Sequence, residues 1–423
     1  MTTAKEYILF PWGKQTEIEL KPITRAKGIY FWDQQNRYFD MASQCVNVNI
    51  GHGDEDVINA IKKQCDVLPY AYSNFSEPAR IEAAKKIIEV APKLMRKVFF
   101  TNSGAESNEN AIKIARMYTK RHKIFSAYQS YHGATLGAGN LTGDARRFAC
   151  EPGLPGFVKF SYPHRYRSQI HFDTDAEMSR YFLHILREQI LFEGPDNVAA
   201  IFVEPIIGGN GVIIPPDGYL QGIRVLCDEY GILMVSDEVM TGWGRTGAMF
   251  AIEHWGGSPD MITVSKGVTS SYFPLGAVLV NERIAKHFDQ NALNCGSTHF
   301  AHPIGCAAAS ACIGVYQQKD LVNNSVAMGN LLYEKLLELK EKHQTIGDVR
   351  GKGLFSAIEF VENRSTKEPL KDLGPVMNLL KEKGFWTQNR RHILIVAPPL
   401  IISREELKES LFILDEVLTQ LNL

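Results

Sequence analysis

The feature that most constrains the fold is an alternation of short apolar segments with helical ones through the middle of the chain. The apolar runs 198–203, 232–236 and 261–264 have the length of strands, and each is followed by polar or charged residues. The intervening segment 222–230 has a helical pattern. Strands that alternate with helices predict an α/β sheet with short connections. Such sheets bind ligands beyond the carboxyl ends of their strands, so the polar residues found there are candidates for a functional site.

The segments on either side extend this pattern. Toward the N-terminus we expect a hairpin over 28–41, a helix that begins near Asp54, a strand over 97–100 and a helix over 105–118. Toward the C-terminus we expect helices over 305–316 and 331–339, strands over 353–360 and 393–396, and a last helix that Ser403 and Glu406 begin as a capping box.

The order of these elements suggests two domains. We expect a large domain over residues 51–310 and a small domain formed by residues 311–423 together with the N-terminal segment 1–50. A chain of 423 residues is long enough for both.

Charge and cysteine content exclude several classes of protein. The 46 basic and 47 acidic residues nearly cancel, which speaks against a nucleic-acid-binding or membrane-binding surface. The apolar runs are too short to cross a bilayer, and the first residues lack the apolar core of a signal peptide. The seven cysteines are scattered, with no Cys-x-x-Cys spacing, as is typical of a reduced cytoplasmic protein.

Lys266 is the strongest candidate for a catalytic residue. It directly follows the strand 261–264 and lies between Ser265 and Gly267, at the edge of the predicted sheet. A surface lysine is the ordinary alternative. A lysine that is buried there would have a lowered pKa and could act as a nucleophile toward a carbonyl group.

Asp237 directly follows the strand 232–236 and is expected to be partly buried. A buried carboxylate can keep the pyridine nitrogen of pyridoxal phosphate (PLP) protonated, which this cofactor needs as an electron sink. The alternative is an aspartate that caps the next turn.

Ser103, Gly104 and Ala105 lie between a strand and a helix, where free backbone amides bind phosphate. Tyr131, followed by His132, offers an aromatic face for stacking on a cofactor ring.

Two further motifs are weaker. Gly242 to Gly247 fits the pattern G-x-G-x-x-G, but five polar or mixed residues separate its first glycine from the apolar strand, so we interpret it as a loop. His299 and His302 have no adjacent glutamate and no evident third ligand, so we predict no metal site.

Together these segments resemble the class III (omega) aminotransferases, which have the fold-type I of PLP enzymes. The resemblance covers about residues 20–410 and rests on FTNSGAESNENAIKIAR, SYHGATLGAGNLTG, FVEPIIGGNGVIIPP, LMVSDEVMTGWGRTG, DMITVSKGVTSSYFPLGAV, STHFAHPIGCAAA and VAPPLII, in the order of the family. It implies a large domain with a mostly parallel seven-stranded sheet, a small α/β domain from both termini, and PLP as cofactor.

The resemblance also implies a role for each residue. Lys266 would form a Schiff base with PLP and move the proton, and Asp237 would pair with the pyridine nitrogen. Val239 and Tyr131 would lie below and above the ring, with His132 and Glu204 close by. Ser103, Gly104 and Ala105 would bind the phosphate, and Thr298 would reach it from the partner subunit of a homodimer with shared active sites.

Two positions depart from the family. Met240 stands where many relatives have glutamine, and Ile395 stands where an arginine often binds the substrate carboxylate. Arg390 and Arg391 are the nearest arginines in sequence, and which residue binds the carboxylate stays open.

The pattern is closest to the subgroup that acts on taurine or similar omega-amino acids. We expect transfer of the amino group to 2-oxoglutarate by a ping-pong mechanism, with Trp12 and Arg147 (favoured over Arg146) as ligands of the anionic end of the substrate. The alternatives are transfer from beta-alanine or 4-aminobutyrate to pyruvate, and a decarboxylase or aminomutase of the same fold.

Overall fold

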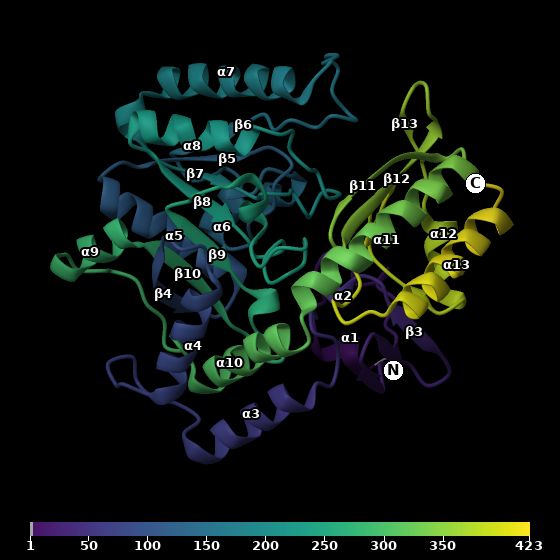
Figure 1. Ribbon diagram of the computed structural model, residues 1–423, viewed down its shortest axis with the longest axis horizontal. Coiled ribbons are helices and arrows are strands. Elements are labelled where there is room, and N and C mark those ends of the chain that lie inside the picture. Colours follow the sequence, from purple (N-terminus) through teal and green to yellow (C-terminus); the bar gives the residue numbers. More distant parts are fainter. Residues whose placement is uncertain (1–2) are drawn as a thin grey trace.

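The computed structural model describes residues 3–423 and is built around a seven-stranded sheet (Figure 1). In spatial order the strands are β4 (Met95–Thr101), β10 (Gly276–Asn281), β9 (Met261–Val264), β8 (Leu233–Asp237), β7 (Val198–Val203), β5 (Lys123–Ala127) and β6 (Phe157–Phe160). Strand β10 is antiparallel to both of its neighbours, and the other six strands run in one direction. The prediction of an α/β fold with a mostly parallel sheet is confirmed.

The central strands consist mostly of apolar residues because both faces of the sheet are covered. Successive residues of β7 point to opposite faces: Phe202 packs in one core with helix α5 (Gly104–Thr119), whereas Ile201 packs in another with α8 (Tyr219–Tyr230). Helix α7 (Asp175–Glu193) contacts α8 on its outer side (Figure 1). Strands of a parallel sheet buried on both faces read as continuous hydrophobic runs, which explains the sequence pattern.

Two smaller sheets lie beside the large one (Figure 1). The first contains β1 (Arg25–Lys27), β2 (Tyr30–Trp32), β3 (Arg37–Asp40) and β14 (Phe385–Trp386). The second contains β11 (Ile346–Lys352), β12 (Phe355–Asn363), β16 (Ile393–Val396) and β15 (Asn389–Arg390), with β13 (Glu368–Pro369) paired to β12. Because β14 pairs with β3, the N-terminal and C-terminal segments share one sheet.

The remaining helices connect or cover these sheets. They are α1 (Thr3–Tyr7), α2 (Ser43–Val46), α3 (Glu55–Val67), α4 (Pro78–Val90), α6 (Leu136–Leu141), α9 (Glu282–Gln290), α10 (Pro303–Gln318), α11 (Leu321–Lys342), α12 (Gly374–Glu382) and α13 (Arg404–Gln420). The predicted capping box of the last helix is confirmed, because the Ser403 hydroxyl accepts from the Glu406 amide and the Glu406 carboxylate accepts from the Ser403 amide. Within residues 3–423, no helix combines the length and the apolar character that crossing a bilayer requires.

The segment 242–247 forms turns, as predicted, and it contains a fully buried arginine. Arg245 Nη2 donates to Ser43 Oγ and to Asn49 Oδ1, both at 3.0 Å, and Nη1 donates to the carbonyls of Leu354 (3.0 Å) and Pro398 (2.5 Å). Burial lowers the pKa of Arg245 to about 10. This guanidinium group therefore ties the large sheet to both the N-terminal and the C-terminal segments.

Candidate active site

Lys266 and Asp237 lie at the same edge of the large sheet. Asp237 ends β8 and pairs with Thr263 of the neighbouring strand β9, and Lys266 follows β9 by two residues. Lys266 is half-buried and has a left-handed backbone, with φ of 46°. Burial lowers the pKa of its ε-amino group, and the nearby carboxyl groups of Asp237 and Glu204 act in the opposite direction. A lowered pKa favours the neutral form of the amine, which is the nucleophilic one.

Three groups hold the Asp237 carboxyl group, which is 3% exposed. Asn108 Nδ2 donates to Oδ2 at 2.8 Å, and the Val239 amide donates to Oδ1 at 3.0 Å. His132 Nδ1 lies 2.6 Å from Oδ2, a contact that requires a proton on Nδ1 when the carboxyl group is ionised. These partners fix the side chain at the strand end, and Oδ1 keeps capacity for a further donor.

The start of helix α5 forms a cradle of backbone groups next to Asp237. Ser103 is the N-cap and accepts from the Glu106 amide, whereas the amides of Gly104 and Ala105 have no carbonyl partner within the helix. A Cβ atom on Gly104 would lie 2.7 Å from Val239 Cγ1, so only glycine allows Val239 to come this close. Gly133 (φ of 139°) packs equally closely against Ala105. The amides and the positive helix end can together accommodate a phosphate group.

Glu204 follows β7 and positions the loop that carries Tyr131. Its Oε1 accepts from the Tyr131 amide at 2.8 Å, and its Oε2 accepts from the Gly208 amide at 3.0 Å. Burial raises the pKa of Glu204 to about 7. Glu204 therefore connects the Tyr131 loop to the strand end that lies beside Asp237.

The neighbour of Tyr131 is Arg146 rather than Arg147. The Arg146 guanidinium lies 3.7 Å from the centre of the Tyr131 ring and forms an ion pair with Asp144. Trp12 contacts Tyr131 edge-on, with ring centres 6.2 Å apart, and lies 5.9 Å from the Arg146 guanidinium. Arg147 instead pairs with Glu151 at 3.3 Å and faces a different cavity. This geometry favours Arg146, the reverse of the preference drawn from the sequence.

A cavity of about 540 Å³ adjoins this cluster and contains further arginines. Its lining includes Arg146, Arg390 and Arg391. Arg390 Nε donates to the Gly209 carbonyl at 3.1 Å. Ile395, where the resemblance led us to expect an arginine, is buried in β16, and Met240 packs against Gly208. The positive charge in the lining of this cavity comes from Arg146, Arg390 and Arg391.

Thr298 contacts Tyr70 within the single chain. It is exposed, and its carbonyl accepts from the Tyr70 hydroxyl at 3.0 Å. The adjacent Ser297 Oγ accepts from Asn102 Nδ2 at 3.2 Å. Asn102 also lines a cavity of about 230 Å³ next to Lys266, so the Thr298 segment lies at the rim of that cavity.

The histidine pair and the cysteines show no metal site. The rings of His299 and His302 are 6.1 Å apart. In the part of the chain from Thr3 to Leu423, no three His, Cys, Asp or Glu side chains come together as metal ligands, and all seven cysteines are free thiols.

Sequence reasoning missed one residue that contacts Asp237 and placed Arg146 second to Arg147. Asn108 lies four residues after Gly104, so it shares a face of α5 with the helix start, and that spacing could have identified it. Arg146 could not have been separated from Arg147, because both occupy the 3₁₀ helix η1 (Ala145–Cys150) and only the fold decides which way each points.

Comparisons with known proteins agree with this geometry. Residues 13–418 match the family model described as aminotransferase class-III. The taurine–pyruvate aminotransferase of Bilophila wadsworthia is 32% identical and aligns over 98% of this chain and 96% of its own length. The putrescine–pyruvate aminotransferase of Pseudomonas aeruginosa is also 32% identical, over 94% of this chain and 90% of its own.

A solved structure is more similar still. The taurine:2-oxoglutarate aminotransferase of Bifidobacterium kashiwanohense, in complex with PLP and glutamate, is 45% identical and superposes with a TM-score of 0.96 over 99% of this chain and 96% of its own. Family model, relatives and structure all point the same way. The chain belongs to the class III aminotransferases, a family of PLP-dependent enzymes.

Proposed function

We propose that this enzyme transfers the amino group of taurine or a similar omega-amino acid to 2-oxoglutarate, with PLP held by Lys266. The observation that carries this proposal is the convergence of Lys266, Asp237 and the start of α5 at one edge of the sheet. These groups offer an amine for the aldehyde, a carboxylate for the ring nitrogen and amides for the phosphate.

The residues at this edge fit the cofactor. When bound, PLP supplies an electron sink for the bond that breaks at the amine-bearing carbon. The Lys266 amine would hold the aldehyde and would carry the proton at that carbon. Asp237 would keep the ring nitrogen protonated, and the amides of Gly104 and Ala105, which follow the N-cap Ser103, would bind the phosphate. Val239 would support one face of the ring.

Tyr131 supplies the other side of this cofactor pocket. One face of its ring is covered by Arg146, which leaves the opposite face available for stacking on the cofactor. Its loop is fixed by Glu204 and by His132, which contacts Asp237. We propose that these side chains orient the ring and keep water away from it.

The anionic end of each substrate is proposed to bind between Trp12, Arg146 and Arg390. Two substrates must enter the same pocket in turn, and both carry a sulfonate or carboxylate group. The Arg146 guanidinium already forms an ion pair with Asp144, so a substrate anion must compete with the Asp144 carboxylate for it. Trp12 adds an indole donor beside this arginine.

The relatives support taurine as the amino donor and leave the acceptor to be tested. The Bifidobacterium protein acts with 2-oxoglutarate, and the Bilophila protein acts with pyruvate. The rival proposals are transfer from beta-alanine or 4-aminobutyrate to pyruvate, and a decarboxylase or aminomutase reaction.

Amino transfer should be measured from taurine, beta-alanine, 4-aminobutyrate and putrescine to each keto acid. Absence of turnover of taurine with either acceptor would end the taurine proposal, and loss of carbon dioxide without amination of a keto acid would favour the decarboxylase.

The adjacent arginines provide a matched pair of variants. Arg146→Gln is expected to raise the KM for 2-oxoglutarate about tenfold or more, because a charge-assisted contact to the substrate is lost. Arg147→Gln removes the same charge one residue away and is expected to change that KM by less than about threefold. Steady-state kinetics of both variants check the assignment, and a larger effect for Arg147 would reverse it.

We further propose a homodimer with shared active sites. The segment 67–75 exposes five large apolar side chains to solvent in the single chain: Val67, Leu68, Tyr70, Tyr72 and Phe75. Contiguous exposed apolar side chains are typical of a protein interface. Because Tyr70 contacts Thr298, the same surface would bring Thr298 to the phosphate in the partner subunit.

Substitution on this surface tests the dimer. Phe75 is 67% exposed, and Phe75→Glu is expected to convert the dimer to monomers, because a charge cannot be buried there without a partner. Phe192, at the end of α7 and 88% exposed, provides the control Phe192→Glu, which should leave the mass unchanged. Light scattering of both variants gives the answer, and a dimeric Phe75→Glu variant would place the interface elsewhere.

A further inference from the structure

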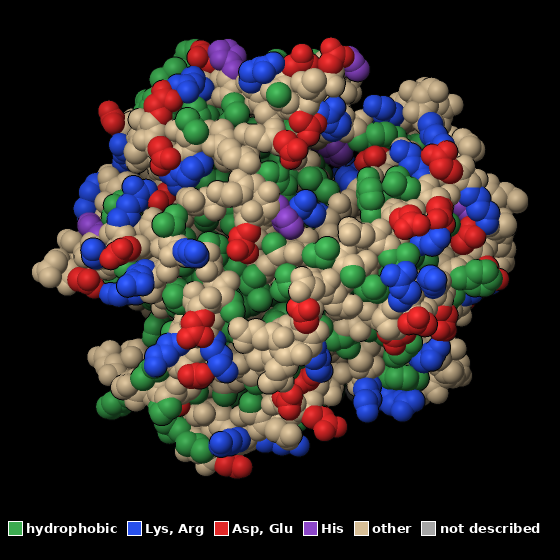
Figure 2. All heavy atoms as spheres, in the orientation of Figure 1, with side chains coloured by type: hydrophobic (Ala, Val, Ile, Leu, Met, Phe, Trp, Pro, Cys, Tyr) green, Lys and Arg blue, Asp and Glu red, His purple; other side chains and the backbone are tan. Residues whose placement is uncertain are grey.

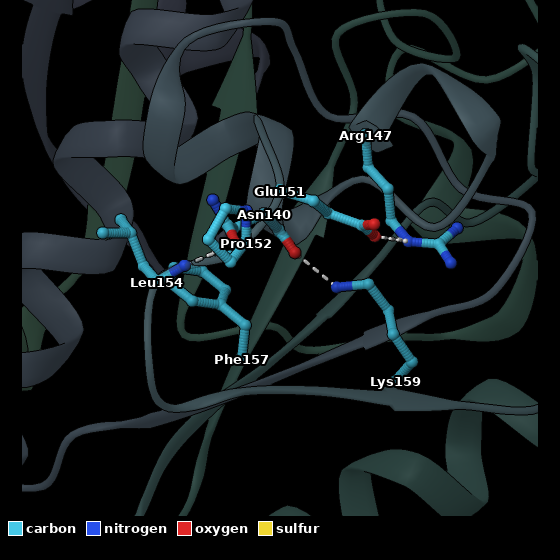
Figure 3. A pocket seen from close by; sticks show the side chains of 8 residues that line it. Asn140, Arg147, Glu151, Pro152, Leu154, Phe157 and Lys159 are labelled. Carbon is cyan, nitrogen blue, oxygen red and sulfur yellow. Dashed lines mark hydrogen bonds and ion pairs between the residues drawn. The ribbon is translucent and has the colours of Figure 1, made fainter. Parts of the chain in front are cut away.

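The cavity that Arg147 faces has a volume of about 370 Å³, and neither Tyr131 nor Arg146 belongs to its lining (Figure 3). Its lining comes from the end of α6, from η1, from the loop 151–154 and from the edge strand β6. The proposed cofactor and substrate contacts do not use it. On the face shown in Figure 2, basic and acidic side chains are interspersed. The lining of this cavity has two basic side chains, Arg147 and Lys159, and one acidic side chain, Glu151.

Lys159 provides one of the two positive charges. Its ammonium group donates to Ser126 Oγ at 2.9 Å and to the Asn140 carbonyl at 2.5 Å, at the end of α6. No carboxylate among residues 3–423 lies within ion-pair distance of it. Burial, followed by the nearby charge of Arg147, lowers the pKa of Lys159 to about 8. An ammonium group has three protons, so one donor remains after these two bonds.

Arg147 provides the second charge and is held in place by neutral groups. Its Nη1 donates to the carbonyls of Gly143 and Asp144, both at 3.2 Å, and its guanidinium lies 4.7 Å from the centre of the Phe148 ring. Within residues 3–423 its acidic partner is Glu151, which lies 3.3 Å from Nε and has a side chain that is 49% exposed. Figure 3 shows Glu151 between Arg147 and Lys159.

We propose that this cavity binds a compact oxyanion, of the phosphate or small-carboxylate class, between Lys159 and Arg147. The Asn140 carbonyl at the end of α6 and the Ser126 hydroxyl of β5 account for two donors of Lys159, but the cavity keeps one net positive charge. Glu151 is the internal competitor for the anion, because it is the single carboxylate in the lining and is exposed enough to move aside. Both cations are already held by hydrogen bonds to the fold, so little further side-chain conformational entropy is lost when an anion binds.

Calorimetry with inorganic phosphate tests this site on the holoenzyme, in which PLP fills its own phosphate cradle. Lys159→Met is expected to weaken phosphate binding about tenfold or more, since one charge-assisted contact is removed. Glu151→Gln is expected to tighten it roughly two- to fivefold, since the competing charge is lost. Arg390→Gln removes a charge from the substrate cavity and should leave this binding unchanged.

The tightening by Glu151→Gln keeps the test decisive, because a damaged fold does not improve binding. If Lys159→Met does not fold, tightening by Glu151→Gln supports the site, and unchanged or weaker binding overturns it. The proposal is also overturned if the unaltered holoenzyme shows no saturable phosphate binding. It is likewise overturned if Arg390→Gln abolishes the binding while Lys159→Met retains it, because the anion would then occupy the substrate cavity.

Discussion

Lys266→Ala is expected to abolish amino transfer, with kcat reduced by at least about a thousandfold. The half-buried amine is placed to hold the cofactor aldehyde and to move the proton, and alanine can do neither. The measurement is the formation of keto product from the best donor, together with the visible absorbance of the protein-bound cofactor, which should also change.

Lys97→Ala is a suitable control for this variant. Lys97 is an exposed lysine of β4 in the same sheet, paired with Asp289 at 2.6 Å. Its loss should leave the rate within about twofold, because surface ion pairs contribute little. Full activity of Lys266→Ala would show that the reaction does not pass through this lysine, and the proposed function would have to be abandoned.

Asp237→Ala is expected to retain part of the bound cofactor and to lose activity by about a hundred- to a thousandfold. The phosphate cradle at α5 does not depend on Asp237, whereas the protonated ring nitrogen does. Asp237→Asn, which keeps the shape and removes the charge, should lose nearly as much. Cofactor content and kcat, measured on the same samples, separate binding from catalysis.

Asn108→Ala distinguishes the charge of Asp237 from its placement. This change removes the 2.8 Å hydrogen bond to Asp237 Oδ2, together with the bonds of Asn108 to the His132 carbonyl (2.7 Å) and from Thr263 Oγ1 (2.9 Å), and it leaves the Asp237 carboxylate itself in the site. We expect a loss of roughly tenfold or more, because a hydrogen bond to the charged group and two bonds that hold its surroundings are lost. If Asp237→Asn were as active as the unaltered enzyme, the electron-sink role of the carboxylate would be refuted.

Strands and helices were predictable where the sequence pattern is local. The strands expected over 198–203 and 261–264 coincide with β7 and β9, because both are runs of apolar residues, with Thr263 the exception, and both are bounded by polar ones. The two-residue strand β14 was not predicted. It pairs with β3 across more than three hundred residues of chain, and so short a segment carries no periodicity of its own.

The site was predictable in its motifs and not in its finer contacts. Lys266 and Asp237 could be named as candidates because Asp237 ends one apolar strand and Lys266 follows the next one by two residues, and parallel neighbours bring such ends together. The orientations of Arg146 and Arg147 were not, since consecutive residues of a 3₁₀ helix diverge by about 120° and the sequence does not fix the starting direction. One arginine faces Tyr131 and the other faces Lys159 only because of how η1 packs.

The buried Arg245 has a consequence for how the molecule loses its structure. Its partners come from residues 43–49, from Leu354 and from Pro398, and each of them compensates for the desolvation of one guanidinium group. If either terminal segment detached alone, the buried guanidinium group would lose some of its hydrogen-bond acceptors without gaining enough water to replace them. We therefore expect the large sheet and the two smaller ones to unfold in a single cooperative transition. No stable intermediate should form in which the terminal segments alone are unfolded.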